Sequence, residues 1–180
     1  MKWKMKIPKG FQPTPNFCHI HQIKAQDGSN NGSPMITITP RANADGSNKR
    51  IHVEHNAQGS GNSRGTMATA PLADFEDEWV QIEQEIHYMP QDKGGYYRIK
   101  MTRISDGKVL INFERDEIEM YRKTATYLRS KYGIYRSLGG NIRNNPDNIN
   151  KLLKNETIDM CDFEIWRKNH NPNPGMVHYR

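Results

Sequence analysis

The stretch Lys131-Tyr132-Gly133-Ile134-Tyr135-Arg136 alternates as a β-strand with two unlike faces does. Residues two apart in a strand share a face, so Lys131, Gly133 and Tyr135 are predicted to point one way. The opposite face is mostly apolar. This pattern suits a strand that packs on one face and binds a ligand on the other, with the glycine leaving space near the backbone. An ordinary aromatic-rich strand also fits these six residues and stays open.

Alternation of the same kind recurs along the chain, separated by turns rich in Gly, Pro, Asn and Ser. Strands are predicted at residues 1–7, 17–24, 35–39, 50–56, 79–89, 96–104, 109–113, 129–138 and 157–166, with a hairpin turn at 105–108. No long amphipathic helix interrupts them. Many short strands without long helices predict an all-β fold, a sandwich of two antiparallel sheets. We expect a β-jelly roll of the concanavalin A-like type.

Other segments have weaker signals. Residues 57–70 lack periodicity and are predicted to form a long loop, as are residues 139–150. Residues 116–123 fit a short helix or an irregular crossing, and a short helical piece is expected near 149–154. We expect one domain over residues 1–168 and a loosely held polar tail over 169–180. The chain starts directly with a strand, as if inside a fold. A longer precursor, a start at an internal Met and a jelly roll without its N-terminal strand all stay open.

Composition narrows the class of protein. The 180 residues carry a formal net charge of +6, no run of them is long and apolar enough for a membrane span, and the N-terminus lacks the apolar segment of a signal peptide. A basic surface attracts polyanions: nucleic acid, anionic polysaccharide or anionic membrane. Cys18 and Cys161 lack metal-type spacing, and both free thiols and a disulfide stay open. We expect a monomer.

Two motifs together resemble the signatures of jelly-roll polysaccharide lyases. They are Gln22-Ile23-Lys24 and Arg129-x-Lys131-x-Gly133-x-Tyr135, and they look closest to the glucuronan lyase and heparin-lyase-I-like family. In that family a Gln-Ile-His-type strand and a Tyr-x-Lys-x-Gly-x-Tyr-type strand lie side by side in a concave cleft. Here Lys24 stands where His is common and Arg129 where Tyr is common. The resemblance extends loosely from Trp3 to Trp166.

The resemblance implies a secreted enzyme without a redox cofactor that cleaves a glucuronate-containing polymer by β-elimination. Tyr135 matches the catalytic Tyr, which would take the C5 proton and protonate the O4 leaving oxygen. Gln22 matches the amide that binds the substrate carboxylate and offsets its charge. A histidine substituting for the one missing at Lys24 is taken to be His21, with His19 beside it. Strict alternation puts both on the face opposite Gln22, so a β-bulge would have to re-aim one.

Charged side chains on the predicted strands supply candidate substrate contacts. Lys24, Lys131 and Arg129 are predicted to bind an acidic polymer, and Arg129 suits a carboxylate. His52 and Glu54 fit the cleft face of their strand, and an ordinary solvated strand face is the alternative that stays open for both. No cluster has zinc-site spacing, so no metal ligands are assigned; calcium held by loop oxygens stays open.

Two rival functions belong to other classes. A non-catalytic carbohydrate-binding jelly roll would use the same cleft, with Tyr and Trp rings stacking on sugars. A nucleic-acid-binding module has the least support, because the basic residues are scattered along the chain. Glycoside hydrolysis needs two facing carboxylates, and Glu83 and Glu85 are predicted on the solvated face of an outer sheet.

Overall fold

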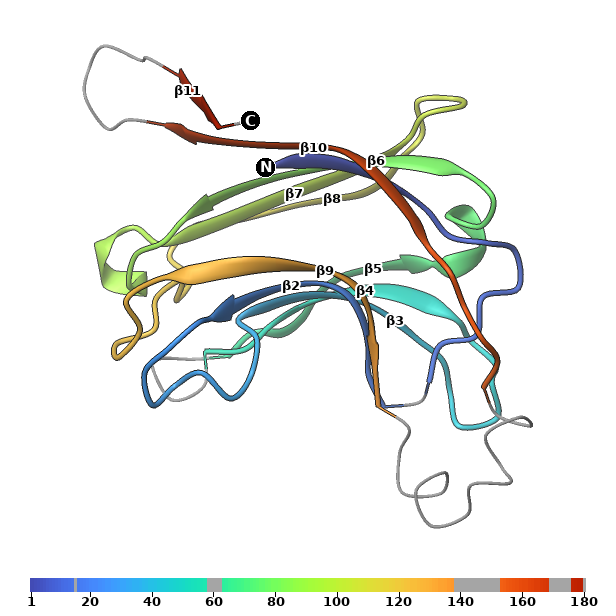
Figure 1. Cartoon of the computed structure of the whole chain (residues 1–180), viewed down its shortest axis with the longest axis horizontal. Coiled ribbons are helices and arrows are strands. Elements are labelled where there is room, and N and C mark those ends of the chain that lie inside the picture. The colour runs from blue at the N-terminus through green and yellow to red at the C-terminus, as the bar shows by residue number, and fades with distance from the viewer. Residues whose placement is uncertain (15, 58–62, 138–152, 169–175, 180) are drawn as a thin grey trace.

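The computed structural model describes residues 1–14, 16–57, 63–137, 153–168 and 176–179. Two antiparallel β-sheets pack face to face and form a β-sandwich of the jelly-roll kind, as Figure 1 shows. Both sheets are arched in the same sense, so the five-stranded sheet presents the hollow side of its arch to solvent (Figure 1). The predicted all-β fold is confirmed.

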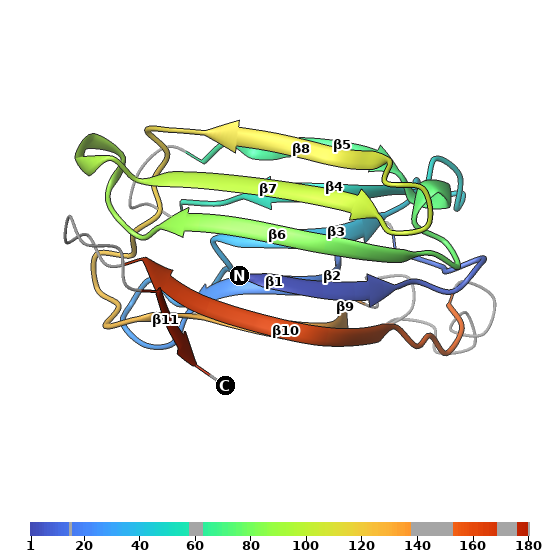
Figure 2. The same ribbon diagram turned by 90° about the horizontal axis from the view of Figure 1, so that it is seen from above.

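The six-stranded sheet has the order β11-β10-β1-β6-β7-β8. Figure 2 shows this sheet in front, with the other sheet behind it. Its strands are β1 (Lys2–Lys6), β6 (Trp79–His87), β7 (Tyr96–Arg103), β8 (Val109–Arg115), β10 (Asp159–Lys168) and β11 (Met176–Tyr179). Its outer face is polar, and it holds Glu85 against Tyr96 and Arg98. The predicted outer, non-groove position of Glu83 and Glu85 therefore agrees with the structure.

The five-stranded sheet has the order β5-β4-β3-β2-β9. Its strands are β2 (Cys18–Ala25), β3 (Ile36–Arg41), β4 (Arg50–His55), β5 (Gly65–Pro71) and β9 (Leu128–Arg136). The two motif strands, β2 and β9, are distant in sequence and adjacent in the sheet. Two short 3-10 helices, η1 (Leu72–Asp74) and η2 (Gln91–Lys93), lie at connections.

Apolar side chains from both sheets fill the space between them. The alternation of β3 and β4 places Ile36, Ile38, Ile51 and Val53 in this core, and β6 adds Val80 and Ile82. Trp3 of β1 is fully buried and contacts the rings of Tyr132 and Phe163. Burial of each such side chain contributes about 1.5–3 kcal/mol, so alternation selects which face of every strand turns inward.

The predicted loop over residues 57–70 is wrong at its C-terminal end, because β5 begins at Gly65. β5 is the edge strand beside β4 and is largely exposed. An edge strand of this kind needs no apolar face, and its Gly, Ala and Thr residues give no strand-like alternation. Pairing with a neighbour, and not its own pattern, makes this segment a strand. Residues 58–62 lie outside the described part of the chain.

Other segments differ from expectation, refine it or lie outside the described residues. β3 continues one residue past Pro40 to Arg41, since proline is tolerated near a strand end. Residues 116–123 form an irregular crossing without helix, anchored by buried Ile118 and Met120. The expected loop at 139–150 lies outside the described residues, as does most of the helical piece near 149–154; Leu153 and Lys154 are not helical. The predicted polar tail contains β11.

Candidate active-site groove

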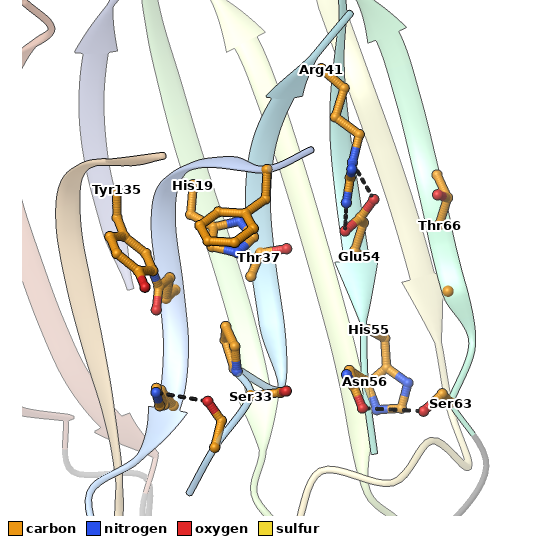
Figure 3. Close-up of a pocket in the computed structure, with 16 residues that line it drawn as sticks. His19, Ser33, Thr37, Arg41, Glu54, His55, Asn56, Ser63, Thr66 and Tyr135 are labelled. Atoms are coloured by element: carbon orange, nitrogen blue, oxygen red, sulfur yellow. Dashed lines mark hydrogen bonds and ion pairs between the residues drawn. The ribbon is translucent and has the colours of Figure 1, made fainter. Parts of the chain in front are cut away.

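A groove of about 530 Å³ lies on the outer face of the five-stranded sheet. Strands β2, β3, β4, β5 and β9 all contribute to it, together with residues 32–34, Asn56 and Ser63 (Figure 3). Of the predicted site residues, Gln22, Lys24, Glu54 and Tyr135 line this groove. The remaining lining includes hydroxyl, amide and ring side chains, one charged side chain and three small or cyclic residues: Phe17, His19, Gly32, Ser33, Pro34, Thr37, Arg41, His55, Asn56, Ser63, Gly65 and Thr66.

A β-bulge in β9 determines which side chains reach the groove. His19 pairs with Tyr135 and His21 with Tyr132. The same interval is therefore three residues long in β9 and two residues long in β2. Gly133 is the residue on the groove face within this interval, and its φ of 118° is a conformation that favours glycine. The bulge breaks the alternation of β2: Ile20 and His21 both face the core, while His19 and Gln22 both line the groove.

His19, and not His21, is therefore the histidine beside Gln22 on the groove face. Its side chain is 8% exposed, and neither ring nitrogen has a hydrogen-bond partner among the described residues. Burial lowers the pKa of His19 to about 4; nearby Glu54 opposes this shift and Arg41 adds to it. The imidazole is thus neutral at physiological pH and keeps its hydrogen-bonding capacity for a ligand.

Tyr135 extends from β9 next to His19, and Figure 3 shows the two rings side by side. Tyr135 is 60% exposed, so its hydroxyl is accessible from solvent. Phe17 stacks on His19 at 4.7 Å between ring centroids and contacts the Tyr135 ring at 5.2 Å. These three rings form one continuous aromatic surface at one end of the groove.

Three cations gather beside the groove on β2 and β9. Lys24 pairs with Arg129 across the two strands and Gln22 pairs with Lys131, so all four side chains are on the groove face. Burial lowers the pKa of Lys131, and the neighbouring charges of Arg129 and Lys24 lower it further. Within the described ranges, none of these cations forms an ion pair with a carboxylate. The Lys24 ammonium donates to the Gly32 carbonyl at 2.9 Å.

The opposite side of the groove holds a closed ion pair. The Arg41 guanidinium donates to both carboxylate oxygens of Glu54, at 2.9 and 3.0 Å, and also to the Asn16 carbonyl. Dashed lines in Figure 3 mark the Arg41–Glu54 pair. His52 lies on the same strand face, with Nδ1 3.8 Å from Glu54, but does not line the groove. Burial lowers the pKa of His52.

His21 lies in the core and is 1% exposed. Its Nδ1 is 3.1 Å from the Lys131 carbonyl, which only accepts, so Nδ1 carries the hydrogen. Nε2 then accepts from the Gln84 amide at 3.2 Å, and the Tyr97 hydroxyl donates to the other end of that amide at 2.9 Å. Burial lowers the pKa of His21 to about 4, which keeps this neutral network intact. The predicted part of His21 in the chemistry finds no support in this position.

Phe17, Thr37 and Arg41 were not predicted as site residues. Thr37 and Arg41 could have been found by continuing the alternation of β3 through Pro40, which puts both on one face. Phe17 immediately precedes β2 and carries no signal that separates it from a core residue. Its role depends on its contact with His19, which only the folded chain creates.

Three further features concern metal binding, the cysteines and membrane spans. The described residues contain no group of three or more His, Cys, Asp or Glu side chains arranged to bind a metal ion. Cys18 is buried and Cys161 partly buried, and the two are separate thiols. Burial raises the pKa of Cys18 to about 11, so this thiol is unreactive. No helix within the described ranges has the length and apolar character to span a membrane.

Comparison of the chain with protein-family models, with curated proteins and with solved structures gives no match. Function must therefore be argued from the groove itself.

Proposed function

We propose that this protein is a polysaccharide lyase that cleaves a glucuronate-containing acidic polysaccharide by β-elimination. The observation that carries the proposal is the juxtaposition of Tyr135, His19 and Gln22 on one groove face, beside cations that form no ion pair with any carboxylate of the described residues. Elimination needs a base, an acid and donors that offset the charge of the uronate carboxylate. The groove offers side chains of each kind, and an enzyme of this type would act outside the cell.

In the proposed reaction, the Tyr135 phenolate removes the proton from C5. The electron pair forms the C4=C5 double bond, the C4–O4 bond breaks, and the proton returns from Tyr135 to the leaving oxygen, so atoms and charge balance. Gln22 and the neutral His19 hydrogen-bond the carboxylate, on which negative charge grows in the transition state. Lys131 and Lys24 supply positive charge near this carboxylate, which further offsets its negative charge.

A non-catalytic carbohydrate-binding module is the second candidate. The continuous surface of Phe17, His19 and Tyr135 favours it, because stacked rings offer a flat apolar face to a sugar. Elimination needs the hydroxyl of Tyr135, whereas stacking needs only its ring. The two candidates therefore respond differently to removal of that one oxygen atom.

The test is incubation with glucuronan while the ultraviolet absorbance of the unsaturated product is followed. We expect product with the parent protein and a fall in turnover of roughly 10²-fold or more for Tyr135→Phe, the usual scale for a positioned proton-transfer group. Binding should change little, because the ring contacts with Phe17 remain. Tyr127→Phe is the matched control, since Tyr127 is 57% exposed and does not line the groove.

Two outcomes contradict the proposal. If Tyr135→Phe turns over as fast as the parent, the hydroxyl is not the proton-transfer group. If the parent binds uronate polymers without ever generating the unsaturated product, the binding-module function replaces the lyase.

A further inference from the structure

Five side chains form a row across the five-stranded sheet. The registers pair Lys131 with Gln22, Gln22 with Thr37, Thr37 with Glu54, and Glu54 with Thr66. The last four of these line the groove, and the row crosses the strands at a right angle. Neighbouring strands are about 4.8 Å apart, so Gln22 and Glu54 are separated by roughly 10 Å. A polysaccharide lying along this row would pass each side chain in turn.

The two ends of the row differ in charge. At the β9 end, Lys131 stands with Lys24 and Arg129, and these cations have no carboxylate partner among the described residues. At the β5 end, the sole charges lining the described groove are Arg41 and Glu54, and they neutralise each other through two hydrogen bonds. Thr37, Thr66, Asn56 and Ser63 surround this pair with hydroxyl and amide groups.

A paired carboxylate and guanidinium suit uncharged sugar rings. Glu54 keeps lone pairs that can accept from sugar hydroxyls, and its side chain is 22% exposed. A second carboxylate placed there would meet the negative charge of Glu54, while the guanidinium that could offset it is already engaged. A homopolymer of uronates carries a carboxylate on every ring and so cannot avoid this encounter.

We propose that the groove selects an acidic heteropolysaccharide in which uncharged sugars separate the uronates, with Glu54 as the residue that disfavours a uronate homopolymer. This specificity rests on the proposed lyase function for its catalytic readout. The uronate that is cleaved lies over β2 and β9, and neutral rings lie over β4 and β5.

The experiment compares two polymers: glucuronan, and deacylated gellan, in which neutral sugars separate the glucuronates. Both kcat/KM for the unsaturated product and Kd by calorimetry are measured for the parent, Glu54→Gln and a matched control. Glu164→Gln is that control, because it removes the same charge from β10, which belongs to the other sheet. The double variant Arg41→Gln with Glu54→Gln keeps the net charge and guards against effects of an unpaired Arg41.

The parent should prefer gellan over glucuronan by roughly fivefold to tenfold, the scale of one incompletely neutralised charge contact. Glu54→Gln should raise kcat/KM and lower Kd for glucuronan far more than for gellan. The double variant should lose most of the preference for gellan, and Glu164→Gln should keep that preference. Equal use of the two polymers by the parent, or an equal response of both to Glu54→Gln, overturns the proposal. Absence of product from either polymer contradicts the lyase function alone, because the same preference is then read from the Kd values.

Discussion

Two histidines two positions apart show how environment assigns roles to identical residues. Burial lowers the pKa of both His19 and His21 to about 4. His21 satisfies both ring nitrogens inside the core, through Lys131 and Gln84. His19 has neither nitrogen bonded to a described residue and faces the groove. His21 is therefore a structural residue, and His19 can meet a ligand.

The cations beside Gln22 lead to a prediction about binding. Lys131→Gln should weaken the binding of glucuronate oligomers by roughly threefold to tenfold and flatten the dependence of Kd on salt, because screening then acts on one charge fewer. Lys100→Gln is the matched control, since Lys100 is exposed on β7 of the other sheet. Calorimetry at low and high salt measures both. Equal losses in the two variants would show that only net charge matters.

At the scale of elements, the bulge in β9 is the feature that assembles the groove. Without the additional residue at Gly133, β2 and β9 would pair residue for residue. His19 and Gln22, three positions apart, would then point to opposite faces. The bulge allows the aromatic surface and the Gln22–Lys131 pair to share one face. His21 holds this segment from below through the Lys131 carbonyl.

Gly133→Ala should separate the backbone effect from packing, because a Cβ there meets no atom within 4 Å. The cost is conformational: at φ 118° an alanine should lower the free energy of unfolding by roughly 1–3 kcal/mol. Turnover should fall as well, since relief of this strain reorients Tyr135. Urea unfolding and product formation measure the two effects.

Gly107→Ala provides the comparison for this prediction. Gly107 also has open space and a positive φ, of 71°, but lies in the β7–β8 turn. The Gly107→Ala protein should lose about 1 kcal/mol in free energy of unfolding and keep full turnover. A Gly133→Ala protein that is destabilised yet fully active would show that the bulge does not position Tyr135.

For the whole molecule, the buried histidines predict acid sensitivity. Their folded pKa values lie below the ordinary 6.5, so the unfolded state binds more protons than the folded state in this range. Stability is therefore complete above about pH 6.5 and is lost as the pH falls toward about 4. As the pH falls from about 7 to about 5, His19 and His21 should each lower the free energy of unfolding by on the order of 2 kcal/mol. Chemical denaturation across this range measures the slope.

Removing either titrating group tests its share of this slope. His19→Phe keeps an aromatic ring against Phe17, and His21→Phe keeps one against Tyr132. Each variant should show a shallower loss of stability with falling pH than the parent, whatever its stability at pH 7. A slope unchanged in both variants would assign the acid sensitivity to other groups, such as His52 and His55, whose pKa values burial also lowers.

The sequence by itself determined the class of fold and much of the groove's charge. Alternation at residues 35–39, 50–56 and 131–136 reports which side chains turn inward, because period two is a local property of an extended chain. It correctly put Lys131 and Tyr135 on one face of β9. Lys24, Arg129 and Glu54 also reached the groove face that their patterns predicted.

Only the tertiary structure decided which histidine joins Gln22, that Arg41 closes on Glu54, and that residues 65–71 form a strand. Each depends on pairing between segments distant in sequence. A bulge is defined by two strands together, so β2 alone could not reveal that His19 would turn outward and His21 inward. An ion pair across 13 residues and an edge strand without an apolar face likewise exist only once neighbouring strands are in register.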